Sequence, residues 1–185
     1  RCGMYHSAAM LFEEMRKSNV QPTLITYNIA LQYYAKQQGA LDVMRSLFDE
    51  IPQRKLKPDI HTFNAVLSGY SRLGRYKETI EIYEKLKATG VPRNNASYTF
   101  ILAAFANTGD YKSLFRVLDE MEVEKIIPDT QNVTVMLTAI LHSKSGQQHI
   151  AELSKRMKSW HMTPDKKLTE LLNVLQKRFP TVFLP

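Results

Sequence analysis

A phrase of seven residues recurs four times along the chain and constrains its fold more than any other feature. The copies occupy residues 22–28, 58–64, 93–99 and 128–134, so they are spaced by 35 or 36 residues. At 58–64 the phrase is Pro-Asp-Ile-His-Thr-Phe-Asn, and the other copies place the same or chemically similar residues in several of its columns. A fixed period in the mid-thirties indicates an array of structural repeats in which each unit contacts mainly its neighbours.

Apolar residues and glycines repeat with the same step. A Met or aliphatic residue recurs once per period, at Met15, Ile51, Leu86, Met121 and Met157. A glycine separates the two helical patterns of each unit, at Gly3, Gly39, Gly74, Gly109 and Gly146. This pattern predicts an all-α fold, an α-solenoid of stacked helix-turn-helix repeats in which each helix pair buries its apolar face on the next.

The period also divides the chain into units. Residues 1–23 are predicted to be the second helix of a truncated repeat, with Gly3 in the turn before it, and we expect further chain upstream. Four repeats are predicted, at 24–59, 60–94, 95–129 and 130–165. Residues 166–185 are predicted to form a C-terminal capping helix and a tail, because the prolines at 180 and 185 do not continue a helix.

Apolar spacing of three and four places two helices in each repeat. In the first two repeats they are expected near residues 25–36, 41–53, 61–72 and 76–88. Gly90 is expected to end the last of these, since glycine is favoured just after a helix. In the fourth repeat the polar run 143–148 predicts a longer turn.

Charge and cysteine content restrict the class of protein. The chain has 25 Lys and Arg against 18 Asp and Glu, a net charge of +7 and a pI near 9.4, which favours an anionic partner. Many basic proteins bind no polyanion, so charge alone leaves both interpretations open. The single cysteine, Cys2, excludes an internal disulfide framework and a Cys-rich zinc site. No apolar run approaches the ~20 residues that a membrane span needs, which disfavours membrane roles.

Catalysis finds little support in the sequence. His149 and Glu152 are spaced so that they could share a metal ion, yet two ligands without a third are far more often surface residues. The sequence has no Ser/His/Asp arrangement, no phosphate-binding glycine loop and no paired-carboxylate signature. We therefore expect no enzyme activity, no catalytic residues, no metal site, no cofactor and no small-molecule substrate.

Several columns together resemble the pentatricopeptide repeat (PPR) family, in its pure 35-residue (P) class. They are the Thr-Tyr-Asn opening at 26–28, the glycine turn, the Phe-Asp-Glu-Ile end of a second helix at 48–51 and the Pro-Asp closing at 58–59. The tetratricopeptide repeat has a shorter period and a Trp-containing start, which this sequence lacks. The resemblance covers residues 3–165 and implies a right-handed superhelix, binding of single-stranded RNA and a location in the mitochondrion or chloroplast. The fourth repeat departs most, since Val133 replaces the aromatic residue.

The residues that close the recurring phrase form a column on the first helices of the repeats. Each lies three residues after another member of the phrase, and residues three apart share a helix face. These pairs are Ile25 with Asn28, His61 with Asn64, Ala96 with Thr99 and Gln131 with Thr134. Amides and hydroxyls suit a base edge better than helix packing, so we expect them to face outward into the hollow of the solenoid.

By resemblance, each PPR unit reads one RNA base with the residue that closes the phrase and the last residue of the unit. The implied base-reading pairs are Asn28 with Asp59, Asn64 with Asn94, Thr99 with Asp129 and Thr134 with Asp165. The family's code then gives U, C or U, G and G, from 5′ to 3′. The residues implied to wedge between neighbouring bases are Ile25, His61, Ala96 and Gln131. Because Asp59, Asp129 and Asp165 each precede a predicted helix, each is also a candidate N-cap.

Two basic residues are candidates for contacts with RNA phosphates. Lys36 and Arg72 end the first helices of repeats one and two at equivalent places. Exposed Lys and Arg are common on any soluble protein, so solvated surface charge is the competing interpretation.

Two functions stay open from the sequence. The first is a short, non-catalytic array that binds single-stranded RNA with sequence preference, in organellar RNA processing, splicing, stability or translation. The second is a PPR scaffold subunit of an organellar ribosome or other ribonucleoprotein assembly, with little sequence readout. A peptide-binding helical repeat is disfavoured because the column on the first helices is polar.

Overall fold

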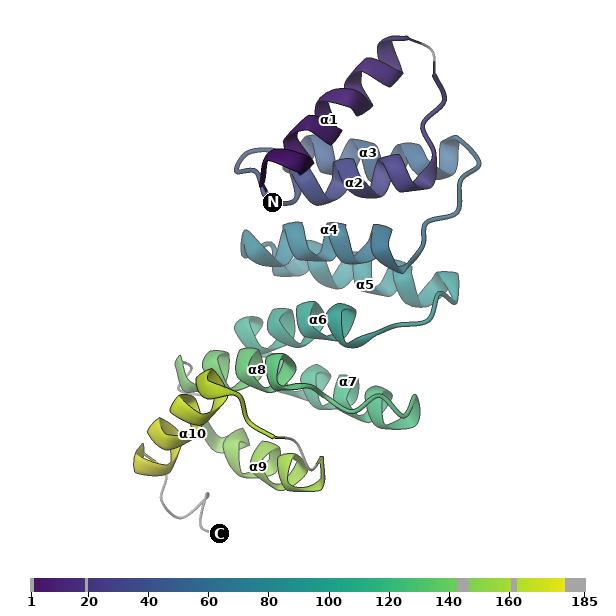
Figure 1. Cartoon of the computed structure of the whole chain (residues 1–185). Helices are drawn as coiled ribbons and strands as arrows, with labels where there is room; N and C mark the ends of the chain where they lie inside the picture. The colour runs from purple at the N-terminus through teal and green to yellow at the C-terminus, as the bar shows by residue number, and fades with distance from the viewer. Residues whose placement is uncertain (1, 19, 143–146, 161–162, 179–185) are drawn as a thin grey trace. The chain divides into compact units, whose positions relative to one another are not determined.

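The architecture is entirely helical in the part of the chain that the structure describes. The computed structural model describes residues 2–18, 20–142, 147–160 and 163–178, which form ten α-helices and one short 3-10 helix, without a strand (Figure 1). The helices belong to two compact units, residues 1–93 and 94–185. The all-α fold predicted from the repeat period is confirmed.

The first unit is built from helix pairs. Its helices are α1 (Cys2–Lys17), α2 (Leu24–Tyr34), α3 (Leu41–Gln53), α4 (Ile60–Arg72) and α5 (Tyr76–Thr89). Helix α2 packs against α1, α3 and α4, and α4 packs against α3 and α5 (Figure 1). The ends of α2 to α5 fall within two residues of those expected from apolar spacing. The first helices of successive pairs, α2 and α4, are therefore direct neighbours.

The second unit follows the same plan. Its elements are α6 (Asn95–Thr108), α7 (Tyr111–Val123), α8 (Thr130–His142), η1 (Gln147–His149), α9 (Ile150–Ser159) and α10 (Lys166–Arg178). Helix α6 packs against α7 and α8, and α8 packs against α10. Leu168 and Leu175 of α10 are fully buried. The predicted tail, 179–185, and most of the predicted polar turn, 143–146, lie outside the described residues.

The repeating apolar column forms the centre of the helix pairs. Ile51, Leu86 and Met121 are completely buried. Between neighbouring helices, the rings of Phe48 on α3 and Phe63 on α4 meet edge to face, with their centroids 5.5 Å apart. Edge-to-face aromatic pairs add about 0.5–1.5 kcal/mol to the gain from burial alone. The three-and-four spacing of apolar residues thus accounts for which face of each helix is buried.

The recurring phrase marks helix starts, and glycines mark helix ends. Asp59 precedes α4 and forms a capping box with Thr62, and Asn94 precedes α6 and forms the same box with Ser97. Such boxes satisfy backbone N–H groups that have no partner within the first turn of a helix. Gly90 ends α5 with φ 71°, in the left-handed region that glycine adopts without steric cost, as predicted.

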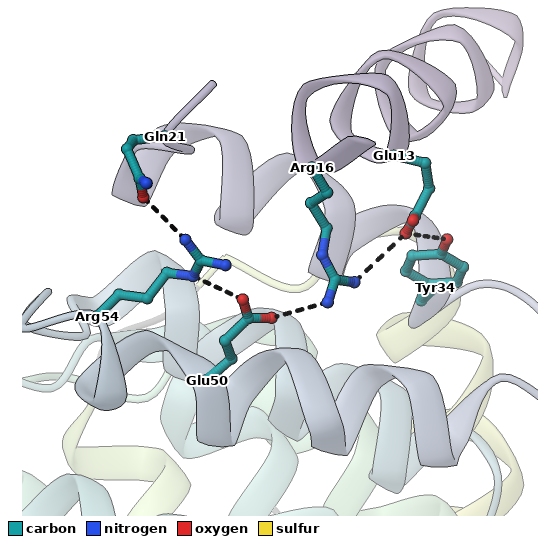
Figure 2. Close-up of polar contacts among 6 residues, drawn as sticks. All are labelled: Glu13, Arg16, Gln21, Tyr34, Glu50 and Arg54. Atoms are coloured by element: carbon teal, nitrogen blue, oxygen red, sulfur yellow. Dashed lines mark hydrogen bonds and ion pairs between the residues drawn. The ribbon is translucent and has the colours of Figure 1, made fainter. Parts of the chain in front are cut away.

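A chain of polar contacts fastens α1 to the following helix pair (Figure 2). The Glu50 carboxylate on α3 accepts from Arg54 at 2.6 Å and lies 3.5 Å from the Arg16 guanidinium on α1. Arg54 also donates to Gln21 at 2.8 Å, in the segment before α2. The pKa of Tyr27 is raised to about 12, mainly because its hydroxyl is buried and secondly because the Glu50 carboxylate lies beside it. Charged and polar contacts therefore supplement apolar packing at this end of the first unit.

One expectation about the start of the chain is wrong. Gly3 was expected in a turn before the first helix, but α1 already begins at Cys2, so Gly3 lies inside it. Glycine tolerates helical as well as turn geometry, and its column position alone did not distinguish the two. Among the described helices, none is both long and apolar enough to cross a membrane.

Candidate nucleic-acid interface

The first site consists of Asn28, Asp59 and Thr62, which come from α2, the residue before α4 and the first turn of α4. Asn28 donates its side-chain amide to Asp59 Oδ1 at 3.1 Å, and its carbonyl Oδ1 accepts from the Thr62 hydroxyl at 2.6 Å. Asp59 Oδ1 also accepts from the Thr62 backbone N–H at 2.9 Å. The predicted base-reading pair Asn28 and Asp59 is therefore in direct contact, and Thr62 touches both members.

Electrostatics favour the ionised form of Asp59. Partial burial by itself would raise the pKa of this carboxyl, but hydrogen bonds from the Thr62 N–H, the Thr62 hydroxyl and the Asn28 amide outweigh it. The result is a pKa below the ordinary value, because these donors stabilise the carboxylate. Asp59 consequently acts only as an acceptor at neutral pH.

The third site consists of Thr99, Asp129 and Asn132, in the second unit. Asn132 of α8 donates its side-chain amide to the Thr99 hydroxyl at 2.7 Å, and its own carbonyl accepts from the Asp129 backbone N–H at 2.9 Å. The Asp129 carboxylate accepts from the Asn132 N–H at 2.8 Å. Here the base-reading pair is joined through Asn132, which occupies the helix position that Thr62 has in α4.

The fourth site consists of Thr134, Asp165 and Leu168, and no described residue bridges Thr134 and Asp165. The Thr134 hydroxyl donates to the Thr130 carbonyl of its own helix at 2.7 Å. Asp165 accepts from the Leu168 backbone N–H at 2.8 Å, so it caps α10. Leu168 stands where Thr62 and Asn132 stand in the other sites, and its apolar side chain is fully buried.

The second predicted pair, Asn64 and Asn94, has one member in each unit. Asn64 is half-buried on α4, and Asn94 is exposed before α6. Asn94 accepts from the Ser97 backbone N–H at 3.1 Å, as an N-cap does. Asp59, Asp129 and Asp165, the acids that close the predicted repeats, are likewise confirmed as N-caps, because each accepts from the backbone N–H three residues on.

The expectation that the base-reading column faces freely outward is wrong for three of its members. Asn28, Thr99 and Thr134 are only 7%, 6% and 5% exposed. The next first helix packs beside each of these residues. It also supplies hydrogen-bond partners to Asn28 and Thr99, whereas the Thr134 hydroxyl bonds within its own helix. Only a small part of each of these three side chains is therefore exposed to solvent.

The predicted wedge residues behave differently. Ile25, His61, Ala96 and Gln131 are all exposed, and the Ile25 side chain is 70% exposed although it is apolar. An isolated exposed aliphatic residue needs no functional explanation by itself. These four exposed residues share one helical position, each three residues before a buried or half-buried polar residue, and form a regular pattern along the first helices.

The two predicted phosphate contacts lie in different surroundings. Lys36 is exposed just beyond the end of α2. Arg72 donates from its guanidinium to the Ala35 carbonyl at 2.6 Å, across 37 positions of sequence. That carbonyl lies at the C-terminal end of α2, where backbone oxygens lack helical partners and a cation is favourable. Arg72 therefore has a structural contact as well as a positive charge.

The roles of Thr62 and Asn132 were not predicted from the sequence. Their signal was present, because a capping box has a polar residue three positions after the cap. What the sequence did not reveal is that each also reaches the preceding first helix. The His149 ring packs against Tyr111 and Phe115, and among the described residues no group of three His, Cys, Asp or Glu side chains could hold a metal.

Family models match most of the chain. The PPR repeat family matches residues 24–69 and 58–107, a pentatricopeptide repeat domain matches 1–37, and a model described as pentatricopeptide repeat-containing protein matches 83–164. Curated relatives from Arabidopsis thaliana include a chloroplastic PPR-containing protein, 33% identical over 49% of this chain and 11% of its own length. A mitochondrial one is 27% identical over 40% of this chain and 15% of its own length. The chain spans only 11% to 20% of the length of the curated relatives it matches.

Solved structures match the fold over the whole chain. PPR10 from maize is 28% identical with a TM-score of 0.71, covering 100% of this chain and 28% of PPR10. PPR10 has also been solved in complex with an RNA element. The PPR domain of Arabidopsis thaliana protein-only RNase P 1, solved with tRNA, is 20% identical, with a TM-score of 0.74. The match covers 95% of this chain and 91% of that domain, and it shows that the two share a fold. The chain is an α-solenoid of helical repeats and belongs to the pentatricopeptide repeat family.

Proposed function

We propose that this chain is a P-class PPR array that binds single-stranded RNA and prefers certain sequences. The observation that carries the proposal is the first site, where an amide and an ionised carboxylate are held together at the edge of a first helix. Bases in single strands expose their Watson–Crick edges, which proteins recognise by such hydrogen-bonding groups. The RNA-bound structure of PPR10 supports this proposal by similarity.

Limited exposure of the base-reading residues is compatible with this role. In the described part of the chain, all the side-chain and backbone donors to the Asp59 carboxylate fall on Oδ1, and Oδ2 accepts none. A carboxylate accepts through both oxygens, and an amide nitrogen donates twice. Internal bonds therefore orient Asn28 and Asp59 while leaving hydrogen-bonding capacity for a base.

The exposed residues Ile25, His61, Ala96 and Gln131 are proposed to separate successive bases. Their exposure leaves them available for stacking or apolar contact with a base face. With the four base-reading pairs, the family's code assigns U, C or U, G and G. Four bases give little contact area, so the affinity of this chain alone is expected to be weak.

The RNA backbone is proposed to contact Lys36 and Arg72. A net charge of +7 favours approach to a polyanion. Each phosphate contact contributes about −0.7 to the slope of log affinity against log salt for a single strand. Binding is therefore expected to weaken steeply as salt is raised.

The cellular role is proposed by similarity alone. Matching relatives are named chloroplastic or mitochondrial, so we propose organellar RNA processing, splicing, stability or translation, without catalysis. The remaining length of a full protein of this kind would supply further repeats or partners.

A scaffold subunit of an organellar ribosome or other assembly is the second candidate. The internal hydrogen bonds of the buried residues Asn28 and Thr99 favour it, because those bonds also join successive first helices. In that case the polar column would stabilise the solenoid, and base identity would have little influence.

Binding of a short RNA containing 5′-UCGG separates the two candidates. We expect it to bind more tightly than a scrambled RNA, and Asn64→Thr to change the preference at the second base only. The matched control is Asn173→Thr, which alters an exposed amide on α10. Equal binding of both RNAs, with no effect of Asn64→Thr, would support the scaffold.

A further inference from the structure

Two residues outside the predicted base-reading pairs form hydrogen bonds with members of those pairs. Thr62 and Asn132 each lie three positions after the acid that closes a repeat, and each contacts the base-reading residue of the preceding first helix. Thr62 lies 34 positions after Asn28, and Asn132 lies 33 after Thr99. Both are completely buried. Neither can therefore touch a ligand directly.

At the first site, the orientation of the Asn28 amide follows from which groups can donate. The Asp59 carboxylate only accepts, so the atom of Asn28 that faces it must be the NH2 group. The carbonyl oxygen then faces the Thr62 hydroxyl, and two oxygens 2.6 Å apart need a proton between them. Only the Thr62 hydroxyl can supply that proton, which it shares between the Asn28 oxygen at 2.6 Å and Asp59 Oδ1 at 2.9 Å. The Asn28 carbonyl is thus engaged internally, and the capacity left for a ligand is an N–H donor.

At the third site, the same logic gives the opposite result. The Thr99 hydroxyl donates its only proton to the Asn95 carbonyl at 2.8 Å. One of its lone pairs accepts the Asn132 amide at 2.7 Å. A hydroxyl has one donor and two acceptor positions, so what remains for a ligand is one lone pair. The third site therefore offers an acceptor where the first offers a donor.

We propose that Thr62 and Asn132 are positioning residues that fix whether the preceding base-reading residue donates or accepts. This inference rests on the proposed RNA-binding function and adds a residue from the following helix to each site. The first site then selects a base with a carbonyl acceptor within reach, such as uracil, over cytosine, whose exocyclic amine donates at the corresponding position. The third site selects guanine, whose N1–H donates, over adenine, whose N1 accepts at the corresponding position.

The decisive variants change the hydroxyl of Thr62 while keeping its size. Thr62→Val removes the proton that holds the Asn28 carbonyl, and Thr62→Ser keeps it. The probe is a short RNA containing 5′-UCGG, compared with RNAs that carry C in place of the first U or A in place of the first G. Loss of one hydrogen bond predicts that Thr62→Val reduces U-over-C discrimination at the first base by about threefold to tenfold. Discrimination at the third base stays as in the unaltered chain, and Thr62→Ser restores the first.

Thr26→Val is the matched control. Thr26 occupies the same position in α2, and its hydroxyl donates to the Thr23 carbonyl at 2.6 Å within its own helix start. It belongs to none of the three sites, so its substitution removes a comparable capping contact without affecting a base-reading residue. Melting temperatures of all variants show how much of any change comes from helix capping.

Asn132→Leu tests the positioning role independently at the third site, in the second unit. Leu168 shows that leucine is accommodated at this helix position. We expect reduced G-over-A discrimination at the third base, with the first base unaffected.

The outcomes separate the two levels of the proposal. If the unaltered chain shows no base preference at the first or third position, the proposed sequence-preferring function is wrong. If it does discriminate, but Thr62→Val changes both positions equally, changes neither or acts no differently from Thr26→Val, RNA recognition stands and the positioning role is wrong. A loss confined to the first base and rescued by Thr62→Ser supports the positioning role.

Discussion

The first and fourth sites have the same kind of composition but different internal connections. Each has a polar residue predicted to read a base, Asn28 or Thr134, and an aspartate that caps the next first helix, Asp59 or Asp165. In the first site the two polar residues are joined directly by a hydrogen bond. In the fourth, among the residues that the structure describes, the Thr134 hydroxyl bonds only within its own helix. The difference lies in a third residue, which is polar in one site and Leu168 in the other. A pair of residue types therefore does not by itself define a preorganised site.

The largest effect is expected from truncating the residue that makes the fourth site apolar. Leu168→Ala removes a completely buried side chain from the contact of α10 with α8, and such truncations cost about 2–5 kcal/mol of unfolding free energy. Urea denaturation measures the change. Val174→Ala, on the same helix but at a side chain that is 54% exposed, is the control and should cost less than about 0.5 kcal/mol. Equal effects of the two would mean that α10 is not anchored through Leu168.

The two capping aspartates provide the next comparison. Asp59→Ala removes a helix cap and also leaves the buried Asn28 amide without its acceptor, so we expect a loss of about 2–4 kcal/mol. Asp165→Ala removes only a cap and should cost about 1 kcal/mol. Both are measured by the same denaturation experiment. Similar losses for the two variants would contradict the view that the first site is the more connected.

A double-mutant cycle measures this connection directly. Asn28→Ala and Thr62→Val remove the two ends of one buried hydrogen bond, so their effects on unfolding should be non-additive by about 0.5–3 kcal/mol. In the fourth site, Thr134→Val and Asp165→Ala share no bond and should be additive within about 0.5 kcal/mol. Additivity in both sites would show that the Asn28–Thr62 contact contributes no net stability.

The smallest effect concerns pH. The pKa of Asp59 is lower in the folded chain than its ordinary value, so the ionised carboxylate stabilises the fold above the unfolded pKa of about 4. That contribution is lost as pH falls through the lower, folded pKa. Asp59→Asn keeps an N-cap but has no carboxylate, so its stability should decline less than that of the unaltered chain below about pH 4. Denaturation at several pH values measures both stabilities. If the stability of Asp59→Asn and that of the unaltered chain decline equally below about pH 4, this assignment is wrong.

Helix positions were predictable because their causes are local. The apolar spacing that predicted helices near 41–53 and 76–88 is satisfied within each helix, and α3 and α5 end within one residue of those limits. The N-cap roles of Asp59, Asp129 and Asp165 also depend on the next few residues only. Periodicity and capping chemistry are both written in short stretches of sequence.

Side-chain exposure was not predictable in the same way. Spacing placed Asn28 and Thr99 on a common helix face, but their burial depends on partners more than 30 positions later in the chain. The contact of Arg72 with the Ala35 carbonyl, 37 positions apart, is of the same kind. A period indicates that neighbouring units pack, but it does not indicate which polar atoms then meet.

The bridging position of Thr62 has a practical consequence for engineering such arrays. A repeat transplanted as residues 24–59 would carry Asn28 and Asp59 but not Thr62. The Asn28 side chain would then contact the residue that the recipient array has at the position of Thr62. Grafts that extend through the first turn of the following helix would keep the three hydrogen bonds among Asn28, Asp59 and Thr62. Cassettes for building new binding proteins should therefore overlap at their junctions instead of being joined end to end.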